Sequence, residues 1–336
     1  MPRPDPASWL YPTPAGLYCE PGGFYIDPMG KADRALITHG HSDHARRGHG
    51  AVMATAETID IMKVRLGERA AGSMQAIPCG ETTEINGVRV RFEPAGHILG
   101  SAQIVLEWAG TRIVVSGDYK RRPDPTTPGF EPVGCDVFIT EATFGLPIYR
   151  HEPAAAEIGK VLNSLQLFPE RTHVIGAYSL GKCQRLIALL RAAGFGRPIY
   201  VPDGFLPLIA LYERFGVPLG PVARLSEAAP NSLAGEIVLA PPGRLSDGLS
   251  APMIAPLMIE ASGWMRTEKR RRQGIELPLV ISDHADWPEL IQTIKETGAG
   301  EIWVTHGAPE ALCHACQKMG LKARALSEIG RAGVEE

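Results

Sequence analysis

The sequence predicts an α/β protein in which both ends of the chain build one core and a smaller α/β domain is inserted between them. Three observations carry this prediction. The first third alternates short apolar runs with tight turns, the middle alternates strand and helix patterns, and the strand-then-helix rhythm resumes after Pro278. The 336 residues suit about two domains. We expect the core at 1–145 and 278–336, and the inserted domain at 146–277.

The first third reads as strands, because its apolar runs are short and bounded by turn residues. A helical period follows the second of these strands at 57–66, and the sequence Ala109-Gly110 predicts a hairpin turn. The expected strands are 34–38, 51–54, 88–94, 102–108, 111–116 and 136–140.

Beyond residue 145 the chain alternates longer helical periods with short strands. This alternation is typical of parallel sheets, whose strands are joined by crossover helices. The expected helices are 153–166, 181–193, 286–297 and 309–319, and the expected strands are 173–177, 198–201, 279–281 and 301–305.

Composition excludes several classes of protein. The 34 basic against 37 acidic residues give a net charge of −3, which argues against a basic coat for nucleic acid. No apolar run approaches the roughly 18 residues of a membrane span, and the N-terminal residues show no apolar export signal. Six scattered cysteines do not make a disulfide framework. We therefore expect a cytoplasmic protein without a membrane partner.

The sharpest chemical signal is the run from His39 to His44, which reads His-Gly-His-Ser-Asp-His. Imidazole and carboxylate groups are the ligands that zinc and similar ions take. His39 and His41 lie two residues apart at a strand end, so they point the same way. Asp43 and His44 follow on the turn. One short segment can therefore offer two ligands to one metal ion and two to its neighbour.

Two further residues stand where such a cluster needs partners. His97 follows the strand at 88–94, and Asp118 follows the strand at 111–116. Alone, either would be read as a surface or capping residue. Together with the histidine cluster they predict a metal site at the mouth of a sheet.

The order of Asp27, the His39–His44 cluster, His97 and Asp118 resembles that of the metallo-β-lactamase fold hydrolases. Three later segments are similar to motifs of the β-CASP nuclease branch: Thr140-Glu141-Ala142-Thr143, Ser282-Asp283-His284 and Val304-Thr305-His306-Gly307. The compact size and the opening segment Gly16-Leu17-Tyr18-Cys19-Glu20 resemble the bacterial ligase-associated DNA exonucleases. This resemblance implies an αββα sandwich with an inserted β-CASP-type domain.

The resemblance also implies roles for single residues. Two divalent metal ions are expected, zinc or alternatively manganese. One ion would be held by His39, His41 and His97, the other by Asp43, His44 and His306, with Asp118 bridging them and Asp27 supporting the cluster by hydrogen bonds. A bridging hydroxide would attack phosphorus. His284, oriented by Glu141, would protonate the leaving oxygen.

Basic residues beside these motifs are expected to contact substrate phosphates. Three runs qualify: Arg46 and Arg47 after the histidine cluster, Lys120 and Arg121 after Asp118, and Arg270 and Arg271 before the His284 motif. Lys182, in a stretch that resembles the helix entry of the β-CASP insert, is a further expected contact.

The expected function is a metal-dependent nuclease, with a DNA exonuclease in DNA repair favoured and an RNA exo- or endonuclease as the alternative. A DNA ligase and a helicase are partners implied by resemblance only. A small-molecule metallo-hydrolase on the same core is a weaker alternative, because the segments from Glu141 to His306 would have no purpose there. A non-catalytic binding subunit should have lost ligands, and here every ligand position is filled.

Overall fold

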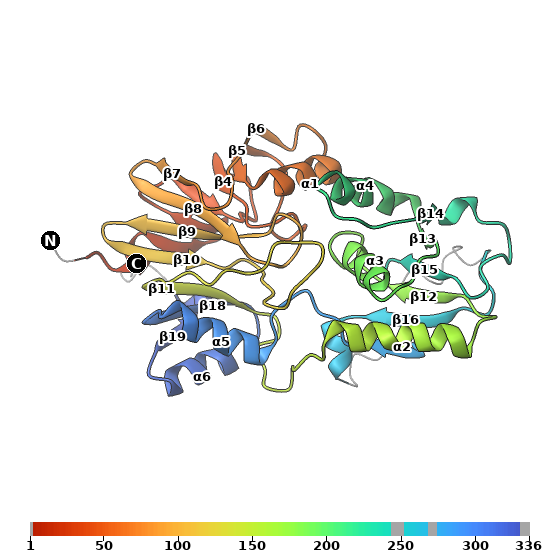
Figure 1. The fold of residues 1–336 in the computed structure, drawn as a ribbon. Helices are drawn as coiled ribbons and strands as arrows, with labels where there is room; N and C mark the ends of the chain where they lie inside the picture. The colour runs from red at the N-terminus through yellow and green to blue at the C-terminus, as the bar shows by residue number, and fades with distance from the viewer. Residues whose placement is uncertain (1–2, 243–251, 268–273, 330–336) are drawn as a thin grey trace. The chain divides into compact units, whose positions relative to one another are not determined.

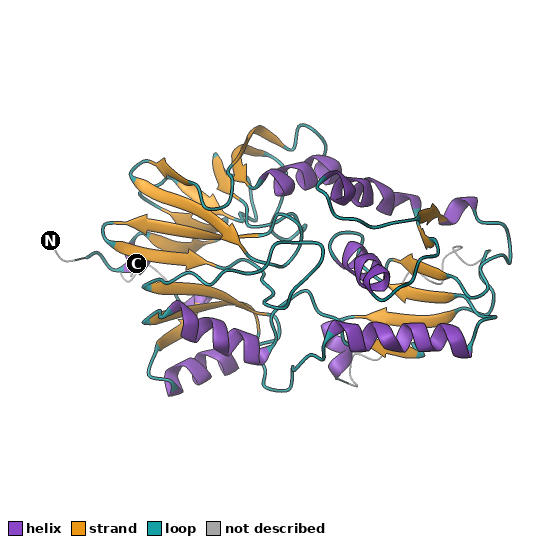
Figure 2. Cartoon of the chain, viewed as in Figure 1, coloured by secondary structure: helices purple, strands orange, loops and turns teal. Residues whose placement is uncertain are grey.

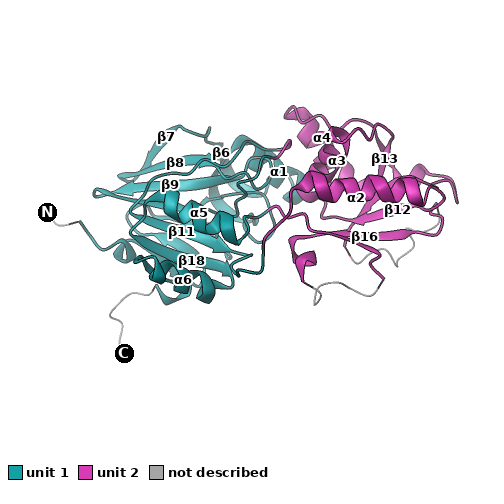
Figure 3. Ribbon diagram, turned by 60° about the horizontal axis from the view of Figure 1, so that its bottom comes forward, with its two compact units in different colours: residues 1–123, 127–149, 284–336 teal, residues 124–126, 150–283 magenta. Residues whose placement is uncertain are grey.

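The computed structural model describes residues 3–242, 252–267 and 274–329, and the chain divides into two compact units. Unit 1 contains residues 1–123, 127–149 and 284–336, and unit 2 contains residues 124–126 and 150–283 (Figure 3). Arg270 and Arg271 lie outside the described residues. The expected assignment of a catalytic domain, and of a β-CASP-type domain inserted at 146–277, stays a prediction.

The first sheet of unit 1 is built by residues 10–76, whose six strands pair in chain order. The first three strands are antiparallel and the pairs from β3 to β6 are parallel. The strands are β1 (Leu10–Thr13), β2 (Gly16–Cys19), β3 (Phe24–Ile26), β4 (Arg34–Leu36), β5 (His49–Ala54) and β6 (Ala71–Ala76).

The second sheet of unit 1 joins the middle of the chain to its C-terminal part. Seven of its strands lie in the described residues, in the order β19-β18-β11-β10-β9-β8-β7. Strands β7 to β10 form an antiparallel meander, whereas β11, β18 and β19 run parallel to β10. The strands are β7 (Thr82–Ile85), β8 (Val88–Pro94), β9 (Ala102–Trp108), β10 (Thr111–Val115), β11 (Val137–Ala142), β18 (Glu301–Gly307) and β19 (Lys322–Ala325).

Two tight turns set the register of the meander. Ala109 and Gly110 join β9 to β10 with φ values of 48° and 79°, and Asn86 and Gly87 join β7 to β8 with φ values of 50° and 82°. Positive φ at both central residues matches the twist of the flanking strands and suits Asn-Gly best. The hairpin expected at Ala109-Gly110 is confirmed, although alanine pays a steric cost there.

The two sheets of unit 1 pack face to face around one apolar core. Leu10 and Phe24 from the first sheet and Phe92 and Trp303 from the second are buried in the same cluster. Burying a side chain of this size contributes about 1.5–3 kcal/mol, so this cluster holds the layers together.

Helices cover the outer faces of both sheets (Figures 1 and 2). Helix α1 (Ala56–Leu66) places Ile59 and Met62 against the first sheet. Helices α5 (Trp287–Thr297) and α6 (Pro309–Lys318) place Leu290, Ile294 and Leu312 against the second. Unit 1 is therefore layered helix, sheet, sheet, helix.

Unit 2 contains a parallel sheet in the order β14-β13-β15-β12-β16-β17. Its strands are short, and the central strand β15 is wholly apolar, as parallel strands buried on both faces are. The strands are β12 (His173–Gly176), β13 (Ile199–Val201), β14 (Val222–Arg224), β15 (Ile237–Ala240), β16 (Leu257–Ala261) and β17 (Leu277–Leu279), and the helices are α2 (Ala154–Leu167), α3 (Lys182–Ala192) and α4 (Leu206–Arg214).

The α/β class expected from the sequence is confirmed in both units. Short 3-10 turns complete the described elements at Pro6–Ser8, Asp203–Phe205, Leu225–Glu227, Gly263–Arg266 and Leu326–Glu328. Among the described residues, no helix combines the length and the apolar content that crossing a bilayer requires.

Candidate metal centre

The expected site residues collect where strands of unit 1 end. His39, His97 and Asp118 each stand three residues after the last residue of a strand, namely β4, β8 and β10. Glu141 and His306 lie at the ends of β11 and β18. Because β8, β10, β11 and β18 all run in one direction, their carboxyl ends meet at one edge of the sheet.

Three imidazoles and one carboxylate converge on a single point at this edge. His41 Nδ1 lies 3.1 Å from His39 Nε2 and 3.0 Å from His97 Nε2. Asp118 Oδ2 lies 3.6 Å from His39 Nε2 and 3.7 Å from His97 Nε2. Ligands bound to a tetrahedral zinc ion at 2.0–2.1 Å are about 3.3–3.4 Å apart. The four atoms therefore have the spacing of a zinc ligand set.

The chemistry of these donors also fits a cation. His41 Nδ1 faces two other ring nitrogens, and in a neutral imidazole it has either one N–H or one lone pair, so the two contacts would have to share it. A divalent ion between them would satisfy every lone pair. His39 and His97 are almost completely buried, whereas His41 is half-buried.

Asp118 is shared by a second group of possible ligands. Its Oδ2 lies 3.6 Å from His44 Nε2, and its Oδ1 lies 3.6 Å from His306 Nδ1. His44, Asp118 and His306 offer ligand atoms within 4.8 Å of one another. Asp118 thus stands between two groups, the place expected of a bridging ligand.

Asp43 is the expected ligand that is most exposed and lies apart from the second group of ligand atoms. Its side chain is 70% exposed, and its Oδ2 lies 3.8 Å from His44 Nε2. Among the described residues it is not one of the side chains that converge there.

Asp27 holds the histidine cluster from behind. Its Oδ1 accepts a hydrogen bond from the backbone N–H of Thr38 at 2.8 Å, and its Oδ2 accepts one from the Thr38 hydroxyl at 2.6 Å. The same Oδ2 lies 2.7 Å from His44 Nδ1. A proton on Nδ1 leaves His44 Nε2 facing Asp118, so Asp27 sets the direction of the ring.

Two residues of the centre have left-handed backbone conformations. Asp27 has a φ of 44° and His306 a φ of 52°. Such conformations are uncommon outside glycine and asparagine and cost free energy, so they persist only where neighbouring contacts hold them. Both residues make close contacts with other site residues.

Charge is distributed over the centre by burial and by neighbouring groups. Burial lowers the pKa of His39 well below its usual value, so its ring is neutral. Burial also lowers the pKa of His44, but the carboxylates of Asp27 and Asp118 outweigh it and raise this pKa to about 9. Burial raises the pKa of Asp118, and the surrounding imidazoles bring it well below its usual value. A cation binding beside Asp118 would therefore replace the proton of His44.

Glu141 and His284 form a pair beside the metal ligands. His284 Nδ1 lies 2.9 Å from Glu141 Oε2, and Glu141 Oε1 accepts a hydrogen bond of 2.8 Å from the backbone N–H of Tyr119. Glu141 is buried, whereas the His284 side chain is 24% exposed and its Nδ1 lies 4.0 Å from Asp118 Oδ2. The carboxylate thus orients the His284 ring through its Nδ1.

The chain is similar to known proteins over most of its length. A probable DNA ligase from Opitutus terrae is 27% identical over 304 residues, which cover 88% of this chain and 29% of that protein. The cleavage and polyadenylation specificity factor subunit 3 of Dictyostelium discoideum is 32% identical over 127 residues, 37% of this chain and 16% of that protein. Ribonuclease TTHA0252 of Thermus thermophilus is 26% identical over 219 residues, 55% of this chain and 49% of that protein.

These similarities support the resemblance of the chain to the β-CASP branch of the metallo-β-lactamase fold nucleases. The chain spans at most about half the length of these three relatives. No protein-family model matches it. A protein of unknown function from Enterococcus faecalis V583 has a similar fold, with a TM-score of 0.60 at 13% identity over 89% of this chain and 80% of that one.

Two of the basic residues expected to contact the substrate are buried. The Lys120 ammonium group is buried and donates to the carbonyl of His97 at 3.3 Å. The Lys182 ammonium group is buried in unit 2, 2.9 Å from the Asp283 carboxylate. Buried ammonium groups held by protein acceptors do not present themselves to a phosphate, so the structure gives both lysines structural contacts instead.

The arginines beside the motifs differ in how firmly they are held. Arg121 is paired with Glu296 at 2.7 Å. Arg46 donates weakly to the carbonyl of Met29 at 3.4 Å, and Arg47 is exposed and donates to the carbonyl of Leu66 at 2.7 Å. Arg46 and Arg47 thus remain the predicted phosphate contacts that solvent reaches.

Sequence reasoning missed supporting residues whose partners lie far along the chain. Thr38 binds Asp27 through its backbone and its hydroxyl, and Arg65 donates to the carbonyl of Gly40 inside the histidine cluster. The position of Thr38 directly before His39 was a usable signal. Arg65 had none, because it lies on helix α1, 25 residues from its partner.

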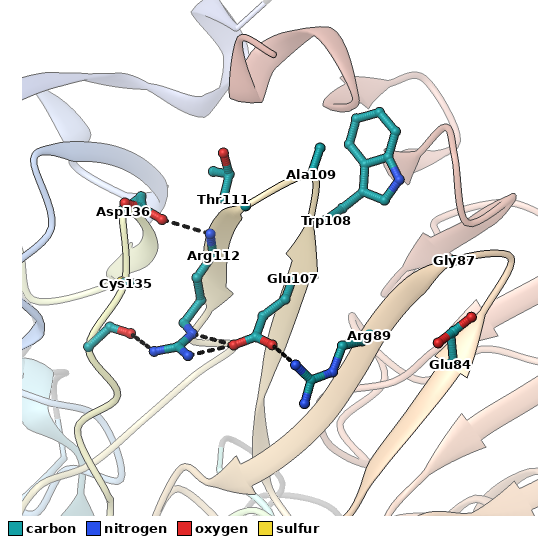
Figure 4. A pocket seen from close by; sticks show the side chains of 12 residues that line it. Glu84, Gly87, Arg89, Glu107, Trp108, Ala109, Thr111, Arg112, Cys135 and Asp136 are labelled. Atoms are coloured by element: carbon teal, nitrogen blue, oxygen red, sulfur yellow. Dashed lines mark hydrogen bonds and ion pairs between the residues drawn. The ribbon is translucent and has the colours of Figure 1, made fainter. Parts of the chain in front are cut away.

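One hollow of unit 1 lies away from the candidate metal centre. It encloses about 640 Å³ at the opposite ends of β9 and β10, beside the Ala109-Gly110 turn (Figure 4). Glu107 there is paired with Arg89 at 3.0 Å and with Arg112, whose guanidinium also donates to the carbonyl of Gly134 at 3.0 Å. Arg89, Glu107 and Arg112 thus pair with one another, and none of the expected site residues lines this hollow.

Proposed function

We propose that the chain is a metal-dependent nuclease that hydrolyses phosphodiester bonds of nucleic acid. The observation that carries the proposal is the sharing of Asp118 between two groups of imidazole ligands, with the Glu141–His284 pair directly beside it. A phosphodiester needs stabilisation of charge on phosphorus-bound oxygens and a proton for the leaving oxygen. This combination of groups supplies both.

The first metal ion would be held by His39, His41, His97 and Asp118, and the second by His44, His306 and Asp118, with Asp43 as a further expected ligand. We propose zinc, with manganese as the alternative, because imidazole and carboxylate ligands suit both ions. When bound, two such ions supply Lewis acidity toward a phosphate oxygen and activate water as the nucleophile.

The protein groups have separate tasks in the proposed reaction. Asp27 orients His44, as its 2.7 Å contact with Nδ1 indicates. Glu141 would accept a hydrogen bond from the Nδ1–H of His284. Its negative charge favours the imidazolium form, which carries a second proton on Nε2. His284 would deliver that proton to the leaving oxygen as the bond from phosphorus to that oxygen breaks, a transfer typically worth about 10²–10⁴ in rate.

We further propose a DNA exonuclease that acts in DNA repair in the cytoplasm, with a ligase and a helicase as partners. The similarity to a probable DNA ligase over 88% of the chain supports DNA. The free thiols of all six cysteines support a reducing compartment. The similarity to a ribonuclease supports RNA as the alternative substrate. The catalytic domain would be 1–145 with 278–336, in an αββα sandwich, and the β-CASP insert 146–277.

Incubation of the pure chain with labelled oligonucleotides tests this proposal. The protein is stripped with a chelator and then given zinc or manganese, together with single- and double-stranded DNA and RNA labelled at the 5′ or the 3′ end. We expect metal-dependent product ladders that start at one end of DNA. Ladders on RNA alone would establish the alternative, and intact substrates under every condition would overturn the nuclease assignment.

A further inference from the structure

Unit 2 contains a buried network of four charged side chains that the proposed chemistry does not use. Lys182 and Arg185 supply two positive charges, and Asp124 and Asp283 supply two negative ones. All four side chains are at most 10% exposed. Charges this deeply buried are costly unless they are paired and hydrogen-bonded, and here the charges balance.

The two basic residues lie on one face of helix α3, because they are three residues apart in its first turn. Gln184 fixes this turn. Its Oε1 accepts a hydrogen bond from the backbone N–H of Gly181 at 2.8 Å, and its Nε2 donates to the carbonyl of Ser179 at 2.9 Å. These hydrogen bonds hold the first turn of α3, which carries both cations.

These cations hold three consecutive residues of the chain. Lys182 Nζ donates to the carbonyl of Ile281 at 2.7 Å and pairs with Asp283 Oδ2 at 2.9 Å. Arg185 Nη1 donates to the carbonyl of Ser282 and pairs with Asp283 Oδ1 at 2.7 Å. The segment lies between the end of β17 and the start of α5, so no regular backbone ladder holds it.

Arg185 also reaches a second segment. Its Nε lies 3.0 Å from Asp124 Oδ2, and Asp124 Oδ1 accepts hydrogen bonds from the backbone N–H and the hydroxyl of Thr126. Asp124 stands six residues after Asp118, and Asp283 stands directly before His284. One guanidinium thus ties together the segments that continue from two residues of the metal centre.

We infer that Lys182 and Arg185 are positioning residues of the nuclease, which fix the backbone carrying His284 so that its ring is placed to protonate the leaving oxygen. The inference rests on the proposed function. It also explains why Lys182, expected at a phosphate, is buried instead: burial lowers its pKa, and the Asp283 carboxylate opposes that effect. A displacement of about 1 Å in a reacting group costs about 100-fold in rate.

The test compares two substrates that differ in their need for a proton. One is a DNA oligonucleotide, whose leaving oxygen must be protonated. The other is the p-nitrophenyl ester of thymidine 5′-phosphate, whose leaving group departs as a stable anion. Loss of a correctly placed acid slows the first reaction and spares the second. The KM values, the bound metal and the melting temperature are measured beside kcat.

Arg185→Lys is the informative variant, because it keeps the buried charge but cannot bridge Asp124, Asp283 and the carbonyl of Ser282 together. We expect kcat on DNA to fall about 100-fold, with an unchanged KM and an unchanged kcat on the nitrophenyl ester. Combining it with His284→Ala should give no further loss on DNA. If Arg185→Lys does not fold, Lys182→Gln carries the same test.

Arg191→Lys is the matched control on the same helix. Arg191 donates to the carbonyls of Leu219, Phe195 and Arg197, all outside the segment before His284. It should lower the melting temperature and leave both kcat values unchanged. Equal slowing of both substrates by Arg185→Lys, a pure change in KM, or the same selective loss in Arg191→Lys would overturn the inference alone. A wild type that is inactive on both substrates would overturn the proposed function, and the inference with it.

Discussion

His44 Nδ1 lies 2.7 Å from Asp27 Oδ2, and this contact ties the histidine cluster to the start of the chain. Asp27 has a left-handed backbone, with a φ of 44°, which turns its carboxylate toward Thr38 and His44 together. A single side chain thus fixes the backbone before His39 and the ring direction of His44. Asp27 thus supports the candidate metal ligands without being one of the side chains that converge there.

Asp27→Asn should weaken metal binding about 10- to 100-fold. Both oxygens of Asp27 accept hydrogen bonds, and an amide has only one oxygen, so its NH₂ group would face a donor of Thr38 or of His44. The loss should fall on the ion that His44 would hold. Competition of a chromophoric chelator for zinc measures it, with Asp203→Asn in unit 2 as the control. Equal affinities in Asp27→Asn and the wild type would contradict the support that we assign to Asp27.

His41→Ala and Asp118→Ala should abolish hydrolysis and lower the metal content of the pure protein. Asp118 is shared by both ligand groups, so its loss should remove more metal than the loss of His41. Elemental analysis after gel filtration checks this order. Full activity in either variant would be incompatible with a two-metal centre.

His284→Ala should reduce kcat about 10²–10⁴-fold and leave the metal content unchanged. Its ring is oriented by Glu141, and its Nδ1 lies 4.0 Å from Asp118 Oδ2 and is not among the ligand atoms that converge around His41. Glu141→Gln should reproduce part of this loss. Loss of one ion from His284→Ala would make His284 a ligand instead.

The sequence predicted which side chains gather at the strand ends better than it predicted the residues around them. His39, His97 and Asp118 were identifiable because ligand types recur at strand ends, and strand ends are visible as the limits of apolar runs. The pairing of Glu141 with His284 spans 143 residues. Nothing in local spacing reports such a contact, and only the resemblance to β-CASP motifs indicated it.

The burial of the basic residues was not predictable from their spacing. Lys120 and Lys182 stand beside catalytic motifs, as phosphate contacts do, yet both are enclosed by the fold. The position of a lysine in a sequence does not show whether its side chain has a buried partner. Asp283, which pairs with Lys182, lies 101 residues further along the chain. In the same way strand β15 lies in a region rich in proline and glycine, and only its neighbours β12 and β13 make it central.

Ala109→Asn should stabilise unit 1 by about 1 kcal/mol, because alanine at a φ of 48° is strained and asparagine tolerates that conformation. In the hairpin between β7 and β8, Asn86 already occupies the corresponding position, with Gly87 after it. A rise of a few degrees in the melting temperature would confirm the effect. The reciprocal change Asn86→Ala should lower it, by more than Ala109→Asn raises it, since Asn86 also donates to the carbonyl of Gly22.

His49 should make the protein sensitive to mild acid. The residue is 2% exposed, and neither ring nitrogen has a hydrogen-bond partner in the part of the chain that the structure describes. Burial lowers its pKa below the usual 6.5, so the unfolded chain binds a proton more readily than the folded one. The stability from its neutral form is complete above pH 6.5 and is lost as the pH falls from there toward the folded-state pKa.

His49→Leu should remove this sensitivity and the cost of an unpaired buried polar group, about 1–3 kcal/mol. Urea unfolding of the metal-free protein between pH 7.5 and 5, in steps of about half a pH unit, measures both effects. His314→Leu, on the solvent side of α6, is the matched control and should follow the wild type. If His49→Leu and the wild type lose stability in parallel as the pH falls, another group is responsible for the acid sensitivity.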